Sequence, residues 1–181
     1  MKVLGIVGSP RRRGNTAALV EAVLEGAAEA GHEAEIFYLG ELEVGPIAEE
    51  GGGLSYPGDD MERLYPHLES MGALVLGSPV YYDHVSSRTK LFIDRLHYYS
   101  ETHGPEYRER FPSGVRFVAA ITYEWDDPGV YDGVLEWMRG RMEHYWGMET
   151  AATLRAEGTH RRPISGRPEL LEKARQVGRD L

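Results

Sequence analysis

The sequence predicts an α/β fold, in which one doubly wound parallel β-sheet carries helices on both faces. Short apolar segments alternate along the chain with amphipathic segments of helical period. The best apolar segments are continuous, as expected of strands that are covered on both sides. A chain of 181 residues is long enough for one sizeable core and too short for two ordinary domains. We therefore expect a single domain over residues 1–181.

Five segments are predicted to be strands. The first reads "KVLGIVG" and the third reads "ALVLGSP", and both begin with a continuous, mostly apolar run. The fifth segment is the weakest of the set. The strands are expected at residues 2–8, 33–39, 73–79, 114–123 and 148–154. Because strands that alternate with helices imply right-handed crossovers, all five should run parallel.

Helices are predicted between these strands. The first helix places Leu19 and Ala27 on one apolar stripe, and Gly31 supplies its stop. Residues 40–58 are rich in glycine and are expected to form a long loop before the second helix, whose pattern contains Pro66. The helices are expected at residues 16–30, 59–70, 86–99, 130–146 and 168–179.

Charge and composition narrow the classes of partner and cofactor. The net charge is −9, and two short arginine runs do not outweigh it, so we expect no nucleic-acid partner. The chain has no cysteine, which excludes disulfides, thiolate nucleophiles and cysteine-ligated clusters. Histidines and carboxylates show no metal-site spacing, so we expect no metal. No apolar run reaches the roughly 20 residues that span a bilayer, and the N-terminus lacks a secretory pattern. We expect no membrane partner and a cytoplasmic location.

The segment "GSPRRRGNT" at residues 8–16 joins the first strand to the first helix. Backbone N–H groups at a helix start lack intrahelical partners and attract anions. Polar side chains surround this start: Ser9, Asn15, Thr16, and Arg11, Arg12 or Arg13. The spacing fits neither a Walker A loop nor the G-x-G-x-x-G fingerprint. The segment predicts a phosphate cradle, and the alternative is a plain helix start with solvated arginines.

Two further loops should complete the same site. "GSPVYYD" follows the third strand, and Tyr81 and Tyr82 lie too close to the strand end for both rings to enter the core. "TYEWDDPG" follows the fourth strand. Because ligands bind beyond the carboxyl ends of strands in such sheets, the three loops should converge. A phosphate turn beside an aromatic loop suits a ligand with one phosphate and a planar ring, although one tyrosine could instead pack in the core.

Segments 8–16 and 77–95 ("GSPVYYDHVSSRTKLFIDR") resemble the paired motifs of the NADPH-dependent FMN reductase family. That family is flavodoxin-like and includes iron–sulfur flavoproteins and quinone reductases. The resemblance covers about residues 1–125 and implies a flavodoxin-like fold with bound FMN. Its phosphate would lie in the first loop and its ring beside the other two. By this resemblance the FMN contacts are Ser9, Arg11, Arg12, Arg13, Asn15, Thr16, Pro79, Val80, Tyr81, Tyr82, Thr122, Tyr123 and Glu124.

The resemblance also implies an activity. An FMN-dependent oxidoreductase would take hydride from NADPH or NADH and pass electrons to a quinone, a flavin or another small acceptor. The flavin carries the chemistry, so no catalytic side chain is expected. The resemblance further implies a homodimer or homotetramer. Two alternatives remain, namely a flavodoxin-type electron carrier without its own substrate and an interaction scaffold that has lost FMN.

Three features depart from the family pattern. Residues 44–61 offer no thiol where iron–sulfur members bind a cluster. Asp83 places a negative charge near the expected ring, and the third loop lacks the usual glycine pair. Elsewhere, Asp94 and Arg95 are expected to form a surface or subunit-contact pair rather than a catalytic one. Residues 98–111 are expected to be either a loop over the pocket or a partner contact.

Overall fold

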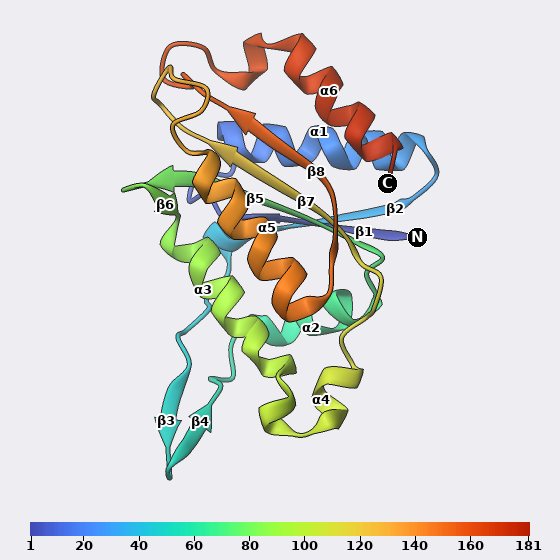
Figure 1. Cartoon of the computed structure of the whole chain (residues 1–181), viewed down its shortest axis with the longest axis vertical. Helices are drawn as coiled ribbons and strands as arrows, with labels where there is room; N and C mark the ends of the chain where they lie inside the picture. The colour runs from blue at the N-terminus through green and yellow to red at the C-terminus, as the bar shows by residue number, and fades with distance from the viewer.

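The computed structural model describes residues 1–181 and confirms the predicted sheet. Five parallel strands lie in the order β2-β1-β5-β7-β8, which is the flavodoxin-like order (Figure 1). They are β1 (Lys2–Val7), β2 (Glu33–Tyr38), β5 (Ala73–Tyr81), β7 (Arg116–Thr122) and β8 (Glu149–Ala156). The strand order reverses at β1 and β5, and folds of this kind bind ligands beyond the carboxyl ends of the strands at such a point.

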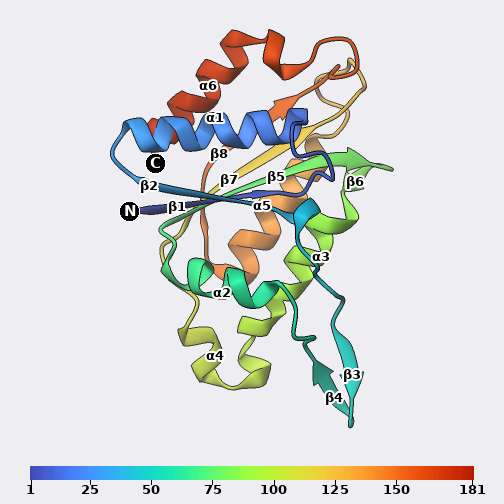
Figure 2. The ribbon, with the colours of Figure 1, turned by 180° about the vertical axis from the view of Figure 1, so that it is seen from behind.

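Helices cover both faces of the sheet, as predicted (Figures 1 and 2). One face carries α1 (Asn15–Glu29) and α6 (Pro168–Arg179). The other face carries α2 (Met61–Ser70), α3 (Ser87–Arg95) and α5 (Asp132–Trp146). No helix combines the length and the apolar character that crossing a bilayer requires.

Successive residues of a strand contribute to opposite cores, because side chains alternate across a sheet. In β1, Val3 and Val7 belong to the core beneath α1 and α6. Leu4 and Ile6 belong to the core beneath α2, α3 and α5. All four side chains are fully buried. Burial on both faces is the physical reason that this strand reads as a continuous apolar run.

Glycines allow α1 and α6 to approach closely. A Cβ built on Gly26 of α1 would lie 1.9 Å from the carbonyl oxygen of Arg175 in α6. A Cβ built on Gly178 of α6 would lie 1.9 Å from the carbonyl oxygen of Val23 in α1. Any larger residue at either position would collide with backbone, so the helices would have to separate.

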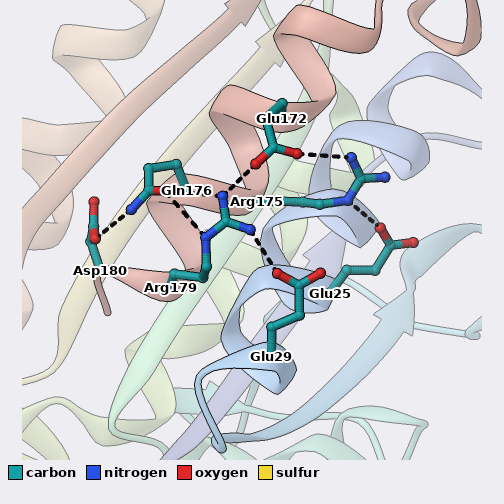
Figure 3. A network of polar contacts seen from close by, with 7 residues as sticks. All are labelled: Glu25, Glu29, Glu172, Arg175, Gln176, Arg179 and Asp180. Carbon is teal, nitrogen blue, oxygen red and sulfur yellow. Dashed lines mark hydrogen bonds and ion pairs between the residues drawn. The ribbon is translucent and has the colours of Figure 1, made fainter.

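Ion pairs flank this contact on the outer surface (Figure 3). Arg175 contacts Glu25 at 2.9 Å, and Arg179 contacts Glu29 at 2.6 Å, so both bridges join α6 to α1. Glu172 lies on α6 between the two arginines. Exposed ion pairs contribute little individually. The network therefore orients the two helices, while close packing and apolar burial supply most of the stabilisation.

The predicted loop over residues 40–58 contains a hairpin that the sequence reading missed. β3 (Ala48–Glu50) and β4 (Gly53–Ser55) pair antiparallel. Between them, Gly51 and Gly52 have φ angles of +61° and +84°, the backbone that a two-residue hairpin turn requires. The glycines that indicated a loop are thus the turn itself. The hairpin projects away from the sheet and helices in both views (Figures 1 and 2).

The helix predicted over 86–99 is shorter than expected. α3 ends at Arg95, and Leu96–Tyr99 form a 3₁₀ turn. The following stretch includes α4 (Pro105–Glu109), and no residue of 98–111 lines the cavity at the strand ends. Tyr99 instead contacts Tyr65 of α2 through an edge-to-face ring pair. The expectation of a loop over the pocket is therefore wrong for this stretch.

A buried ion pair anchors the chain on either side of the hairpin. Arg95 is 1% exposed, and its guanidinium contacts the Asp59 carboxylate at 2.5 Å and the Gly45 carbonyl at 2.8 Å. The predicted surface pair of Asp94 and Arg95 is wrong, because Asp94 pairs with Lys90 at the surface and Arg95 points inward. Arg95 thereby holds both ends of the hairpin segment to α3.

Candidate functional site

A cavity of about 180 Å³ lies at the carboxyl ends of β1, β5 and β7, where the three loops were expected to converge. Of the predicted contact residues, only Arg12 and Arg13 do not line this cavity. The predicted residues that do line it are Ser9, Arg11, Asn15, Thr16, Pro79, Val80, Tyr81, Tyr82, Thr122, Tyr123 and Glu124. Three further residues complete the lining: Trp125, Tyr131 and Thr159.

The first loop presents unpaired backbone donors to this cavity. α1 begins at Asn15 without a side-chain cap, and its first turn contains no acidic residue. The N–H groups of Asn15, Thr16 and Ala17 have no acceptor in the protein. Ser9 is buried, and its hydroxyl oxygen accepts a hydrogen bond from the N–H of Arg11 at 3.1 Å. The positive end of the α1 dipole is therefore free to meet an anion.

The side chain of Asn15 is held in one orientation. Its Oδ1 accepts a hydrogen bond from the backbone N–H of Ile164 at 2.9 Å. Ile164 is buried in the segment between β8 and α6. Since the oxygen is engaged there, the Asn15 amide group retains two N–H donors for the cavity.

Thr16 is tied to the third loop. Its hydroxyl oxygen lies 2.8 Å from that of Thr122 at the end of β7, and both side chains are buried. One hydroxyl donates to the other, so the accepting group keeps its own proton for a further bond. The pair couples the phosphate-type turn to the neighbouring strand end.

The three arginines of the first loop differ in their surroundings. Arg11 lines the cavity and has no acidic partner in the chain. Arg12 contacts Glu41 at 2.5 Å, and its guanidinium lies 4.0 Å from the centre of the Tyr38 ring. Arg12 and Arg13 lie outside the cavity lining. Arg11 is consequently the guanidinium best placed to reach a ligand.

The second loop is a tight hairpin turn. β6 (His84–Val85) pairs antiparallel with the end of β5, which leaves only Tyr82 and Asp83 between the strands. These two residues have φ angles of +47° and +64°. Positive φ at both positions defines a type I′ turn, which normally takes glycine or asparagine. Tyr82 is fully exposed and Tyr81 half-exposed. Strained backbone that displays an aromatic ring beside a cavity is typical of a ligand-binding loop.

Buried hydroxyl groups join the bases of the first two loops. Ser86 Oγ donates to the carbonyl oxygen of Gly8 at 2.7 Å, and the N–H of Ser86 donates to Ser78 Oγ at 2.9 Å. Thr89 Oγ1 donates to the same Ser78 oxygen at 3.0 Å. The three side chains are almost completely buried. A Cβ on Gly8 would lie 1.8 Å from Thr89 Oγ1, so the network requires glycine there.

The third loop is fastened to the chain that follows β8. The N–H and the hydroxyl of Thr159 both donate to the carbonyl oxygen of Tyr123, each at 3.0 Å. The N–H of Gly158 donates to the carbonyl oxygen of Trp125 at 2.7 Å. The N–H groups of Glu124 and Trp125 have no protein acceptor. Although this loop lacks a glycine pair, it keeps two free backbone donors at the cavity.

Asp83 does not line the cavity. The nearby Asp83 carboxylate raises the pKa of the Tyr131 hydroxyl above its ordinary value. The interaction links the hairpin turn to the start of α5. The negative charge that was expected beside the ring therefore lies outside this cavity, in a neighbouring hollow that Tyr131 also lines.

The sequence does not predict two of the residues that line the cavity, Thr159 and Tyr131. Thr159 lies in the loop after β8. Because ligands bind beyond the carboxyl ends of the strands in such sheets, the position of this loop after the weak last strand is the signal that points to Thr159. Tyr131 precedes α5 and joins the site only because its chain folds back toward the β5–β6 turn. Trp125 belongs to the third loop that the sequence did indicate.

A model of the family described as NADPH-dependent FMN reductase matches residues 1–124. The chain belongs to this family. The matched residues include β1 to β7 and most of the cavity lining. The description of this family names FMN as the flavin and NADPH as the reductant of its members.

Individual relatives agree with this assignment. An iron–sulfur flavoprotein of Methanocaldococcus jannaschii is 38% identical over 100 residues, which is 52% of this chain and 51% of that protein. One of Archaeoglobus fulgidus is 30% identical over 140 residues, covering 75% and 63% of the two chains. A Bacillus subtilis protein, named as an NAD(P)H-dependent FMN-containing oxidoreductase, is 27% identical over 165 residues, covering 87% and 86%.

This FMN reductase family chain spans between half and two thirds of the length of those two iron–sulfur flavoproteins. Clusters of that kind are held by cysteine thiolates. The chain contains no cysteine, and no three His, Asp or Glu residues group as metal ligands. Its residues therefore do not fit an iron–sulfur cluster.

Solved structures share the fold. An NAD(P)H:quinone oxidoreductase from Methanothermobacter marburgensis superposes with a TM-score of 0.71 at 20% identity, covering 99% of this chain and 95% of that chain. An archaeal flavodoxin superposes with a TM-score of 0.62 at 16% identity, with the same coverage. One neighbour is an enzyme and the other a flavodoxin, so fold alone does not decide between these functions.

Proposed function

We propose that the chain binds FMN in this cavity, accepts hydride from NADPH or NADH, and passes electrons to a quinone, a flavin or another small acceptor. The observation that carries the proposal is the uncapped start of α1, which faces an exposed aromatic hairpin across one cavity. FMN supplies the redox chemistry when it is bound. The protein's task is to bind, orient and shield it.

The first loop supports the phosphate-binding part of the proposal. The free N–H groups of Asn15 and Thr16, the Asn15 amide and the unpaired Arg11 all lie at one side of the cavity. Ser9 adds a hydroxyl donor there. Hydrogen bonds to a charged group contribute roughly 1.5–3 kcal/mol each. Arg12 and Arg13 would add long-range attraction for the dianion rather than direct contacts.

The other two loops support the ring-binding part. Pro79, Val80 and the two tyrosines Tyr81 and Tyr82 would flank the isoalloxazine on one side. The segment from Thr122 to Glu124 would face it on the other. The free N–H groups of Glu124 and Trp125 suit the carbonyl and nitrogen acceptors along the ring edge. We further propose that the chain acts as a homodimer or homotetramer.

The visible absorbance of the protein with bound FMN tests this function. Under anaerobic conditions, we expect NADPH or NADH to bleach the bound flavin directly, and a quinone to restore its absorbance. Extraction should release FMN rather than FAD. Failure of both nucleotides, with reduction by dithionite alone, would favour the electron-carrier alternative. Failure to bind added FMN would reject the proposal.

A further inference from the structure

The loop between β1 and α1 has few hydrogen bonds of its own. The N–H of Gly14 donates to the carbonyl oxygen of Arg11 at 3.1 Å, and the N–H of Arg11 donates to Ser9 Oγ. The N–H groups of Ser9, Arg12 and Arg13 have no acceptor in the protein. A loop that is bonded so lightly within itself takes its shape from the neighbours against which it packs.

One such neighbour is the 3₁₀ turn η1 (Leu39–Glu41), which follows β2. A Cβ built on Gly40 would lie 3.1 Å from the carbonyl oxygen of Ser9 and 3.2 Å from the Cα of Pro10. Both atoms belong to the loop backbone, so even a methyl group at position 40 would push the loop by a few tenths of an ångström. Gly40 has no positive φ angle. The close approach of the two backbones, and not the local conformation, therefore requires glycine here.

The η1 turn is itself fixed to α3. Arg88 lies in the first turn of α3, and its Nη1 donates to the carbonyl oxygen of Leu39 at 3.0 Å. The side chain of Leu39 is buried in the core beneath α2, α3 and α5. The next residue of α3, Thr89, packs against Gly8 where the loop begins. The first turn of α3 therefore supports both the beginning of the loop and the η1 turn.

Arg12 fastens the loop to the same turn. Its guanidinium contacts Glu41, the last residue of η1, and lies over the ring of Tyr38, the residue before η1. The Tyr38 hydroxyl in turn donates to Glu21 of α1 at 2.5 Å. Because Glu41 neutralises the guanidinium at close range, the attraction of Arg12 for an anion in the cavity is small. The contacts of Arg12 hold the loop against η1 and do not reach the cavity.

We propose that η1 is the template that sets the shape of the phosphate-type loop, and that Arg12 and Arg88 are positioning residues that join loop, turn and α3. Gly40 fixes the distance between the loop and η1. The affinity of the cavity for a phosphate group then depends on residues that never contact the phosphate. Binding groups must be held within about half an ångström of their productive geometry, so a small displacement of the loop is enough to weaken binding. This inference rests on the proposed function, because FMN is the ligand whose phosphate the loop would bind.

Glu41→Gln is a test in which two explanations predict opposite signs. Removing a negative charge near the loop favours binding of a dianion when only electrostatic attraction acts. If Glu41 instead holds Arg12 in place, the FMN dissociation constant should rise by at least about tenfold, which corresponds to the loss of one hydrogen bond to a charged group. Riboflavin, which has no phosphate, should bind nearly as it does to the native protein. Fluorescence titration of the apoprotein with each flavin measures both constants.

Glu43→Gln is the matched control. Glu43 is exposed and forms hydrogen bonds only through its backbone. Its replacement removes the same charge two positions along the chain and should leave FMN binding unchanged or slightly tighter. Exposed ion pairs contribute little to global stability, so neither variant should move the urea midpoint of the apoprotein. A change in FMN affinity is then not a folding defect.

Arg12→Lys separates the charge of this residue from its position. Lysine keeps the positive charge but lacks the planar guanidinium that stacks on Tyr38. We expect FMN binding to weaken about as much as in Glu41→Gln. The double variant Arg12→Lys/Glu41→Gln should be no weaker than either single variant, because both changes break the same contact. Arg88→Gln should weaken FMN binding in the same direction, because it loosens η1 from α3.

Gly40→Ala displaces the loop directly. We expect at least about a tenfold rise in the FMN dissociation constant, with riboflavin binding nearly unchanged. Gly53→Ala is its control, because the nearest atom to a Cβ there lies at 3.9 Å and the φ angle is not positive.

The outcomes separate this inference from the proposed function. Tighter FMN binding in Glu41→Gln, equal losses for FMN and riboflavin, or equal behaviour of Gly40→Ala and Gly53→Ala would each overturn the inference alone. If the native protein bound no FMN, the proposed function would fail and this inference with it.

Discussion

The side-chain oxygen of Asn15 accepts a hydrogen bond from the backbone N–H of Ile164, a residue 149 positions later in the chain. The bond fixes the Asn15 amide with its donors available to the cavity. It also makes the first loop depend on a segment beyond residues 1–124, which the family model matches.

Asn15→Asp separates ligand binding from support of the loop. Aspartate keeps the acceptor for Ile164 but removes the donors and adds a negative charge beside the proposed phosphate. Losing one hydrogen bond to a charged group costs about 1.5–3 kcal/mol, which is roughly a 10- to 150-fold rise in the FMN dissociation constant. Riboflavin binding, measured by the same fluorescence titration, should change far less. Equal losses for both ligands would contradict a phosphate role.

Thr16→Val leaves the buried hydroxyl of Thr122 without its partner. We expect the free energy of unfolding of the apoprotein to fall by about 1–3 kcal/mol. The double variant Thr16→Val/Thr122→Val should cost less than the sum of the single variants, because neither position then holds an unpaired hydroxyl. Urea denaturation of all four proteins completes the cycle. Additive effects would show that the two hydroxyls are not coupled.

Gly178→Ala tests the contact between α1 and α6. The added Cβ would collide with backbone that cannot give way as a side chain does, so we expect a loss of about 1–3 kcal/mol or more in the free energy of unfolding. Gly140→Ala is the matched control, because a Cβ there meets nothing within 4 Å. That helical substitution should instead stabilise by roughly 0.5–1 kcal/mol. The measurement is thermal or urea unfolding of both variants. Equal changes in stability would contradict the close contact of α1 and α6 at Gly178.

Tyr82→Asn should stabilise the apoprotein and weaken FMN binding. Asparagine tolerates positive φ better than tyrosine, so relief at this turn should raise the free energy of unfolding of the apoprotein by roughly 0.5–1 kcal/mol. The same change removes an aromatic ring from the proposed flavin site and should weaken FMN binding. A variant that binds FMN as tightly as the native protein would remove Tyr82 from the site.

Acidification should weaken the fold through His97. Burial, followed by the nearby His103, lowers the His97 pKa below its ordinary value. Below a pH of about 6.5, His97 in the unfolded chain therefore binds more protons than His97 in the folded chain. The corresponding stability is present above that pH and is lost as pH falls through the lower folded pKa. His97→Gln should flatten this part of the dependence of the urea midpoint on pH, and an unchanged profile would contradict the role.

The β-sheet and most of the cavity could be predicted because they depend on local patterns. Continuous apolar runs predict the buried strands. Ligands in such sheets bind beyond the carboxyl ends of the strands, which predicts that Ser9, Tyr81 and Thr122 lie together. The same rule was not extended to the weak last strand, which is why Thr159 was missed. FMN contact by these residues stays a prediction.

Other features depend on tertiary contacts that no local pattern contains. Arg95 looks like a helix-surface residue, and its burial becomes visible only once Asp59 is brought beside it from 36 positions away. The glycines of residues 51–53 are compatible with a loop or with a hairpin turn, and short-range pairing decided between them. Orientation of Asn15 likewise required the position of Ile164.

The pairing of α1 with α6 sets an order of events during synthesis. The early helix α1 packs against α6, which is synthesised much later, and Asn15 cannot form its hydrogen bond until Ile164 is present. A nascent chain on the ribosome would therefore hold α1 without its outer neighbour until residues 164–179 emerge. We expect the anion-binding turn to reach its final form only after α6 has folded, so that a nascent chain that lacks these residues binds FMN weakly.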